Sequence, residues 1–281
     1  MGICFSRRPT SQSCSDKKVL DTQVKELNTT TATIHSVVPM TNATDNSANT
    51  GSDNGISYAF KSLTSSLMSL FGSADNTAAK RFQIRVEKLF DVYKEPSVDL
   101  ISIDGIERLC NDLEILPEEF RILVFAWKCN AHQMCQLKRV EFAKGCLALN
   151  ADSIELMRTK LSEMVSDLNY NSKDFKSLYR FTFKFGLDNN KGQRILPVDT
   201  AIVLWQLVFD ISEPAILQRW LTFLENSKSV HGIPKDTWNM FLCFAESVPN
   251  GDLTNYDDSD AWPSVFDDFV EHENHQAKKT E

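Results

Sequence analysis

The chain has 281 residues, enough for one or two domains, and its 42% hydrophobic and 24% charged content is ordinary for a globular protein. A formal net charge of −8 argues against a general nucleic-acid binder, which needs a basic face to displace counterions from phosphates. No apolar run approaches the roughly 20 residues that span a bilayer, the start lacks the core of a secretory signal, and the seven cysteines form no CxxC pair. We therefore expect an intracellular protein with reduced thiols and with neither a zinc site nor a disulfide framework.

Residues 1–79 have the composition of a disordered tail. Between Thr10 and Asn54, 20 of 45 residues are Ser, Thr or Asn and none is aromatic, so this stretch cannot bury enough apolar surface to offset the entropy of ordering it. The net charge of −8 belongs to the rest of the chain, because the basic and acidic side chains of the tail balance. Residues 57–72 place apolar side chains at helical spacing, which predicts a short amphipathic segment that either packs on the folded part or touches a membrane.

The folded part is predicted to be all-α. Apolar residues at helical spacing, and helix-start signals such as the Pro-Glu-Glu of residues 117–119, indicate about ten short helices joined by short loops. In chain order they are expected at 81–93, 104–113, 116–127, 139–149, 153–168, 175–185, 198–209, 213–225, 234–247 and 263–273. Residues 101–103 alternate apolar with polar and are expected to pair as a short strand with residues 136–138. The prediction is a compact helical domain at 80–275, with a disordered end at 276–281.

The first six residues, MGICFS, fit the N-myristoylation pattern M-G-x-x-x-[ST]. Gly2 becomes the acceptor once the initiator methionine is removed, and Cys4 is placed for a second, palmitoyl chain. Arg7 and Arg8 can bind an anionic membrane leaflet. A second signal of this kind is needed because one myristoyl chain alone binds a membrane only marginally. We expect a membrane-associated lipoprotein. The plasma membrane is the expected site, and a second pool is expected in the cytoplasm or the nucleus.

Residues 188–199 have the twelve-residue length of an EF-hand calcium loop. Asp188 and Asn190 offer oxygen ligands at the first and third positions. Gly192 offers none at the fifth, and Asp199 is one methylene shorter than the bidentate glutamate usual at the twelfth. We expect an EF-hand-like helical pair without metal, and the alternative is a myristoylated EF-hand-like calcium sensor or adaptor.

The C-terminal part carries uncompensated acidic residues. Residues 236–277 contain ten Asp or Glu and no Lys or Arg, and such a negative field would steer a basic partner. Trp262 and Pro263, at its centre, supply rigid contact area or belong to the core. His132 and Cys135 are close in sequence, but no orienting third group and no phosphate-binding glycine loop accompany them. We expect no enzyme, no catalytic residue, no metal and no cofactor.

Four blocks of sequence together resemble the potentiating-neddylation (PONY) domain of the defective-in-cullin-neddylation family. They are IDGI at 103–106 with CNDL at 110–113 and FAWK at 125–128, YRFTFKFG at 179–186, IPKDTWN at 233–239, and AWPSVFDDFV at 261–270. The match covers about residues 82–274. The lipidation motif resembles the N-myristoylated, third animal type of the family.

The resemblance implies a non-catalytic scaffold component of a cullin-neddylation ligase, in the ubiquitin-like conjugation pathway. Members of the family bind the C-terminal winged-helix region of a cullin with one surface. With another surface they hold the conjugating enzyme charged with the modifier. Bringing the two together promotes modifier transfer through proximity and orientation. The family's cullin-binding residues correspond here to Asp236, Ala261 and Asp267, within the acidic part of the chain.

The second family surface is an apolar pocket for the acetylated N-terminal methionine of the neddylation conjugating enzyme. The matching positions are Ile103, Ile106, Ile122, Phe125, Met134, Leu137, Phe185 and Leu207. A neutral, acetylated terminus can enter such a pocket, whereas a free ammonium would lose its hydration there. At Leu137 an aromatic residue is usual in the family, so the pocket shape is expected to differ. The expected partners are therefore cullins, the N-acetylated conjugating enzyme and a membrane, and not nucleic acid.

Overall fold

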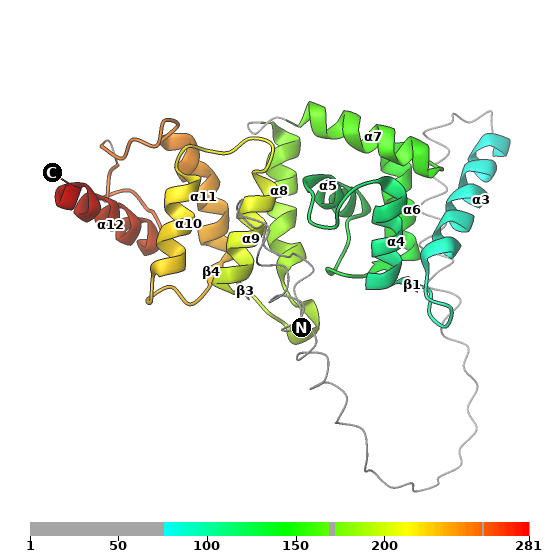
Figure 1. The fold of residues 1–281 in the computed structure, drawn as a ribbon, viewed down its shortest axis with the longest axis horizontal. Helices are drawn as coiled ribbons and strands as arrows, with labels where there is room; N and C mark the ends of the chain where they lie inside the picture. The colour runs from blue at the N-terminus through cyan, green and yellow to red at the C-terminus, as the bar shows by residue number, and fades with distance from the viewer. Residues whose placement is uncertain (1–75, 169–171, 255, 281) are drawn as a thin grey trace, which may run out of the picture. The chain divides into compact units, whose positions relative to one another are not determined.

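The computed structural model describes residues 76–168, 172–254 and 256–280, and the regular structure there is overwhelmingly helical (Figure 1). The described helices are α3 (Asn76–Tyr93), α4 (Ile103–Leu113), α5 (Phe120–Cys129), α6 (Arg139–Leu149), α7 (Ile154–Asp167), α8 (Lys173–Gly186), the 3-10 turn η1 (Asn189–Lys191), α9 (Val198–Val208), α10 (Leu217–Asn226), α11 (Lys235–Ser247) and α12 (Ser264–Thr280). The all-α prediction is confirmed. None of these helices is both long and apolar enough to cross a bilayer. Gly2, Cys4 and the amphipathic segment 57–72 lie outside the described residues.

The first pair of short strands is the one that the sequence predicts. β1 (Leu100–Ile101) and β2 (Leu137–Lys138) run antiparallel, with Ile101 opposite Leu137. Both of these side chains are buried, whereas Lys138 is exposed. The alternation at residues 101–103 located the pair, but the strand ends at Ile101, and Ile103 begins α4 with an exposed side chain.

A second pair of strands was not predicted. β3 (Ile195–Leu196) pairs antiparallel with β4 (Ile233–Pro234), and Leu196 lies opposite Ile233. Two residues per strand leave no alternation to detect, and Pro234 has no N–H to donate to a ladder. Each of the four strands leads directly into a helix (α4, α6, α9 and α11), so the described chain holds two pairs of helix–strand–helix units. The EF-hand-like arrangement expected around residues 188–199 thus occurs twice.

The core of the first pair of units is built around α6. Phe142 is fully buried and meets Phe90 of α3 and Phe125 of α5 edge-to-face, at centroid distances of 5.7 and 6.0 Å. Gly145 lies one turn further along α6, where a Cβ atom would overlap the Sγ atom of Cys129. The missing side chain lets α5 and α6 approach closely. α5 is thereby held rigidly, and the same helix carries part of the site described below.

The core of the second pair of units is a stack of aromatic rings. Trp238 of α11 lies face to face with Trp205 of α9 at 4.7 Å and with Tyr179 of α8 at 5.0 Å. The polar atoms of this stack satisfy one another. The Tyr179 hydroxyl donates to the Trp238 carbonyl oxygen (2.7 Å) and accepts from the Trp205 indole N–H (2.8 Å). The Trp238 indole N–H donates to the Tyr179 carbonyl oxygen (3.0 Å), so three helices are joined by both packing and hydrogen bonds.

Tyr179→Phe should lower the free energy of unfolding by about 2 kcal/mol, because it leaves the buried Trp205 indole N–H without its acceptor while keeping the ring in place. Urea denaturation followed by tryptophan fluorescence measures the change. The matched control is Tyr256→Phe, whose hydroxyl is only half-buried; water can replace the lost contact, so a loss below about 1 kcal/mol is expected. Equal losses in the two variants would mean that the buried hydrogen bonds do not stabilise the stack.

The C-terminal helix α12 packs on α10 and α11 (Figure 1). Phe266 stacks on Trp220 at 5.0 Å, and Phe269 meets the same ring edge-to-face at 5.4 Å. The helix continues to Thr280, in place of the disordered end predicted at 276–281. Ala277 is a strong helix former, and the two lysines that follow it favour the negative end of the helix. The packing fixes the start of α12, which carries two of the predicted site residues.

Candidate functional site

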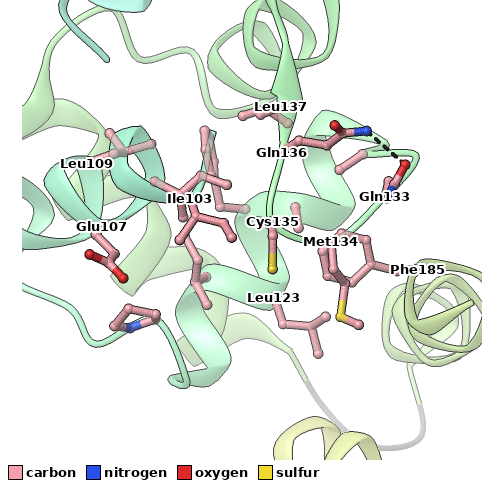
Figure 2. A pocket seen from close by; sticks show the side chains of 16 residues that line it. Ile103, Glu107, Leu109, Leu123, Gln133, Met134, Cys135, Gln136, Leu137 and Phe185 are labelled. Atoms are coloured by element: carbon pink, nitrogen blue, oxygen red, sulfur yellow. Dashed lines mark hydrogen bonds between the residues drawn. The ribbon is translucent and has the colours of Figure 1, made fainter. Parts of the chain in front are cut away.

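An apolar pocket opens between α4, α5, the loop before β2 and the end of α8 (Figure 2). Its volume, including the open mouth, is about 870 Å³. The residues that line it are Ile103, Ile106, Glu107, Leu109, Pro117, Ile122, Leu123, Phe125, Ala126, Ala131, Gln133, Met134, Cys135, Gln136, Leu137 and Phe185. Most are apolar, so the pocket suits a small uncharged apolar group, and the few polar side chains can orient it. We refer to it as the α4–α5 pocket.

Helix periodicity places most of the pocket wall. Ile103 and Ile106 are one turn apart on α4, and Ile122, Phe125 and Ala126 share one face of α5. The family resemblance pointed to all of these positions except Ala126. The pocket is therefore a groove between two helices, closed at its far side by Phe185 and Met134 (Figure 2).

The remaining wall is the loop of residues 131–136, whose path depends on two left-handed residues. Asn130 (φ 50°) ends α5, and Cys135 (φ 62°) turns the chain toward β2. The Gln136 side-chain amide donates to the Gln133 side-chain oxygen at 2.8 Å (Figure 2). Periodicity cannot find such residues, because a non-glycine residue in the left-handed region follows no repeat. The sequence signals these pocket residues only indirectly, because their loop joins two predicted helices and lies next to apolar residues.

Residues of η1 brace this loop from outside the pocket. The Asn189 side-chain amide donates to the His132 carbonyl oxygen (2.7 Å), and the Asn190 amide donates to Gln133 (3.2 Å). Asn190 is the residue expected at the third position of a calcium loop, and here its amide supports the pocket wall. The segment 188–199 therefore helps to position the pocket.

The carboxylates of the EF-hand-like loops are engaged by protein groups. Asp188 accepts from the Lys191 N–H (3.3 Å) and pairs with its ammonium (3.2 Å), and the hydrogen bond to Lys191 is the main cause of a lowered Asp188 pKa. Asp199 accepts from the Thr200 N–H at 2.8 Å. In the loop before α6, Glu141 accepts from two backbone N–H groups, those of His132 (3.2 Å) and Lys138 (2.9 Å). Within the described ranges no three His, Cys, Asp or Glu residues come together as a metal site.

Three of the cysteines are buried and unreactive. Burial raises the pKa of the Cys110 thiol to about 12, and it also raises the pKa values of Cys129 and Cys146. These thiols stay protonated at neutral pH, and a protonated thiol is a poor nucleophile. They act as small apolar residues of the core.

Seven of the eight pocket residues predicted from the family resemblance line the α4–α5 pocket. The eighth, Leu207, is buried on α9 and is not among the lining residues. Ile103 is 45% exposed at the mouth, whereas Phe185 is half-buried and stacks on Phe181 at 5.2 Å. The lining residues that the prediction missed include Leu123 and Ala126, which periodicity on α5 could have found. They also include four loop residues, Ala131, Gln133, Cys135 and Gln136.

The predicted cullin-binding residues lie at the starts of two helices. Asp236 is exposed in the first turn of α11, Ala261 is exposed just before α12, and Asp267 is in the first turn of α12. The Tyr256 hydroxyl donates to the Asp267 carboxylate at 2.6 Å, which ties the loop before α12 to the helix. Ala261 and Asp267 therefore belong to one braced surface. No hydrogen bond or ion pair joins Asp236 to either of them in the part of the chain that the structure describes.

The loop before α12 is packed on α11 by aromatic rings. Phe244 contacts Tyr256 at 5.9 Å, Trp262 at 5.8 Å and Phe266 at 4.9 Å. Trp262 thus contributes to the core and stays partly exposed, which resolves the two roles considered for it. Asp236 precedes Phe244 by eight residues on α11, about 12 Å along the helix axis. A partner that touches all three predicted residues would therefore lie across both helices.

The charge of this surface is strongly negative. Exposed carboxylates surround Ala261 and the start of α12: Asp257, Asp258, Asp260, Asp268 and Glu271. The Tyr256 pKa is raised, first by burial, then by the hydrogen bond to Asp267 and by the nearby acidic charges. Arg219 of α10 pairs with Glu273, further along α12, and donates to the Gly251 carbonyl oxygen at 2.6 Å. We call the start of α12 with its preceding loop and Asp236 the acidic face, and it complements a basic partner.

Comparison with known proteins finds one matching family model and several similar proteins. Residues 156–272 match the family model described as Cullin binding, a span that includes the acidic face and begins after α4 and α5. The chain is 49% identical over 193 residues to DCN1-like protein 3 of Drosophila melanogaster, which covers 68% of this chain and 56% of that protein. It is 49% identical over 198 residues to the Xenopus tropicalis protein (70% and 65% covered) and 47% over 196 residues to the human one (69% and 64%). The chain thus spans less than two thirds of the length of these relatives.

Proposed function

The folded part of this chain belongs to the DCN1-like family of cullin-binding proteins, and on that basis we propose that the chain is a scaffold for cullin neddylation. In this proposal it binds the C-terminal winged-helix region of a cullin and the N-acetylated neddylation conjugating enzyme at the same time. Holding both in one complex raises the rate of modifier transfer by proximity and orientation, without a catalytic residue of its own. The single observation that supports this most is the pairing of an apolar pocket with a separate acidic face in one braced domain.

The acidic face is the proposed cullin site. Its carboxylates lack basic neighbours in sequence from residue 236 to residue 277, so they are available to basic groups of a partner. Ala261 is small and exposed between them, which permits close approach of the partner's backbone. Tyr256 holds Asp267 in place before the partner arrives, and this preorganisation lowers the entropy lost on binding.

The α4–α5 pocket is the proposed site for the conjugating enzyme. Its apolar lining favours an acetylated methionine, because the acetyl group removes the ammonium charge that would otherwise have to leave water. Leu137 is a smaller side chain than the aromatic residue usual in the family, and it is buried in the pocket wall. We infer that this difference changes which conjugating enzyme is preferred.

A scaffold must bind its two partners together. Mixing the full chain with a cullin C-terminal fragment and with acetylated conjugating enzyme should give one complex that contains all three proteins in equal amounts. Analytical ultracentrifugation with differently labelled proteins measures this directly. Two binary complexes that exclude one another would contradict the proposal.

We further propose that N-terminal acylation recruits the chain to membrane. Gly2→Ala removes the only acceptor of the myristoylation motif, so the chain should shift from the membrane fraction to the soluble fraction of cells, with loss of most of its membrane-bound share. Cell fractionation of tagged full-length chains gives the readout, and Cys4→Ser reports the contribution of a second acyl chain. If the Gly2→Ala chain stays membrane-bound, the myristoyl anchor is absent or redundant.

A further inference from the structure

We propose that the side-chain amide of Gln133 determines specificity in the α4–α5 pocket by donating a hydrogen bond to a carbonyl oxygen of the ligand. The inference rests on the proposed function and deepens it. The apolar wall suits any small uncharged apolar group, whereas a fixed donor selects a group that carries a carbonyl. In an acetylated terminus, that carbonyl belongs to the acetyl group itself.

The side-chain oxygen of Gln133 is held by two donors. The Gln136 amide donates to this oxygen at 2.8 Å, and the Asn190 amide of η1 donates to it at 3.2 Å. An amide oxygen has two lone pairs, so both are used. The oxygen therefore faces Gln136 and Asn190, and the nitrogen of the same planar amide, with its two hydrogens, points away from them.

The side-chain nitrogen of Gln133 is a donor that a ligand can reach. It makes no hydrogen bond with another residue in the ranges that the structure describes. It is not sealed in the core, because the buried side-chain polar atoms without a partner in those ranges belong to Trp220 and Asn239. Gln133 is half-buried and lines the pocket, and Figure 2 shows its amide joined to that of Gln136 at one edge of the pocket.

The surroundings make this donor selective. Glu107, also in the lining, only accepts hydrogen bonds when it is ionised, and most of the other lining side chains are apolar. A hydrogen bond made against an apolar wall is stronger than the same bond in open water. A free ammonium terminus offers only donors, so it would leave the Gln133 nitrogen without an acceptor. A site built around a hydrogen bond rejects such a ligand more strongly than an apolar wall does.

The bracing from η1 keeps the donor in one orientation. Rotation of the Gln133 amide alone would break both of its hydrogen bonds and place its nitrogen against the two amides that now donate to its oxygen. The backbone beside it is also fixed, because Asn189 donates to the His132 carbonyl oxygen at 2.7 Å. Gln136, Asn189 and Asn190 are therefore positioning residues, and Gln133 is the group that meets the ligand.

The test uses the full chain and two fluorescent peptides with the N-terminal sequence of a neddylation conjugating enzyme. One peptide begins with acetyl-methionine and the other with thioacetyl-methionine, so they differ in a single atom and both termini are uncharged. Sulfur accepts hydrogen bonds only weakly. The wild-type chain should therefore bind the acetyl peptide about fivefold more tightly, as expected for the loss of one hydrogen bond. Fluorescence polarisation measures both Kd values.

Gln133→Met removes the donor and keeps the length of the side chain, so this variant should bind the two peptides with the same Kd. The matched control is Asn189→Ala, which loosens the same loop by removing the hydrogen bond to His132 but keeps Gln133. It should weaken the binding of both peptides alike and leave the wild-type ratio of Kd values unchanged.

Two results would overturn the inference alone: equal Kd values for the two peptides on the wild-type chain, or the wild-type ratio in Gln133→Met. A wild-type chain that binds neither peptide would overturn the proposed function as well.

Discussion

Replacing Asp236 and Asp267 together by asparagine should weaken binding of a cullin C-terminal fragment about 100-fold, because each carboxylate is expected to make a charge-assisted contact worth about 1.5 kcal/mol. The effect should appear mainly as faster dissociation. Surface-bound fragment and full-length chain give both the Kd and the rates. Asparagine is preferred to alanine here because its side-chain oxygen can still accept the hydrogen bond that Tyr256 donates to residue 267.

The control for this variant makes the same change of charge elsewhere. Asp167 on α7 and Glu225 on α10 are exposed and form no ion pair within the described ranges, so Asp167→Asn with Glu225→Gln tests the effect of net charge alone. We expect less than a threefold change, since exposed charges at a distance are screened by salt. Equal losses in the two double variants would mean that the acidic face acts only through its overall field, and no loss in either would place the cullin site elsewhere.

Ile103→Asp should weaken binding of the acetylated conjugating enzyme about 30- to 100-fold. The substitution puts a carboxylate at the mouth of an apolar pocket, where the ligand would remove it from water at a cost of about 2–3 kcal/mol. The fold should tolerate it. Ile103 is already 45% exposed, and it is the first residue of α4, where an acidic side chain favours the positive end of the helix. Fluorescence polarisation measures the Kd, and circular dichroism checks the helical content.

Ile84→Asp is the matched control for the pocket variant. Ile84 is 52% exposed on α3 and does not line the pocket, so the same loss of an exposed isoleucine should leave the Kd unchanged. Unaltered affinity in Ile103→Asp, with intact helical content, would show that the acetylated terminus binds at another surface. Cullin binding should be normal in both variants, because the pocket and the acidic face lie on different elements.

An element of the fold can be predicted when its pattern of apolar residues is long enough to show a period. The helices follow from apolar residues that repeat over ten or more positions, and β1 with β2 follows from the alternation around Ile101. β3 and β4 were missed because two residues carry no period. The helix expected from residue 116 begins instead at Phe120: Pro117 and the two acids form a turn in which the Glu119 carboxylate accepts from the Leu116 N–H at 2.8 Å. Glu119 directly precedes the helix, and its side chain closes the turn before it instead of capping a helix N–H.

The site is less predictable than the fold. On physical grounds alone, Ile106 and Phe125 look like ordinary core residues, and only the family resemblance marked them as pocket residues. The acidic face could be predicted from the charge of the sequence, but the identity of its partner could not. The bracing of the pocket loop by Asn189 and Asn190 could not be predicted, because hydrogen bonds between residues 57 positions apart leave no local pattern. These hydrogen bonds give the segment 188–199 a structural role at the pocket.

The proposed scaffold role requires that the domain brings a cullin and an acetylated conjugating enzyme together for transfer. The most direct measurement is a single-turnover transfer assay with the full chain, a cullin C-terminal fragment, and conjugating enzyme charged with its modifier, with and without N-terminal acetylation. We predict that the chain accelerates transfer only when the conjugating enzyme is acetylated, and that Ile103→Asp and the Asp236→Asn, Asp267→Asn double variant each remove the acceleration. Equal acceleration without acetylation, or none with both partners bound, would contradict it.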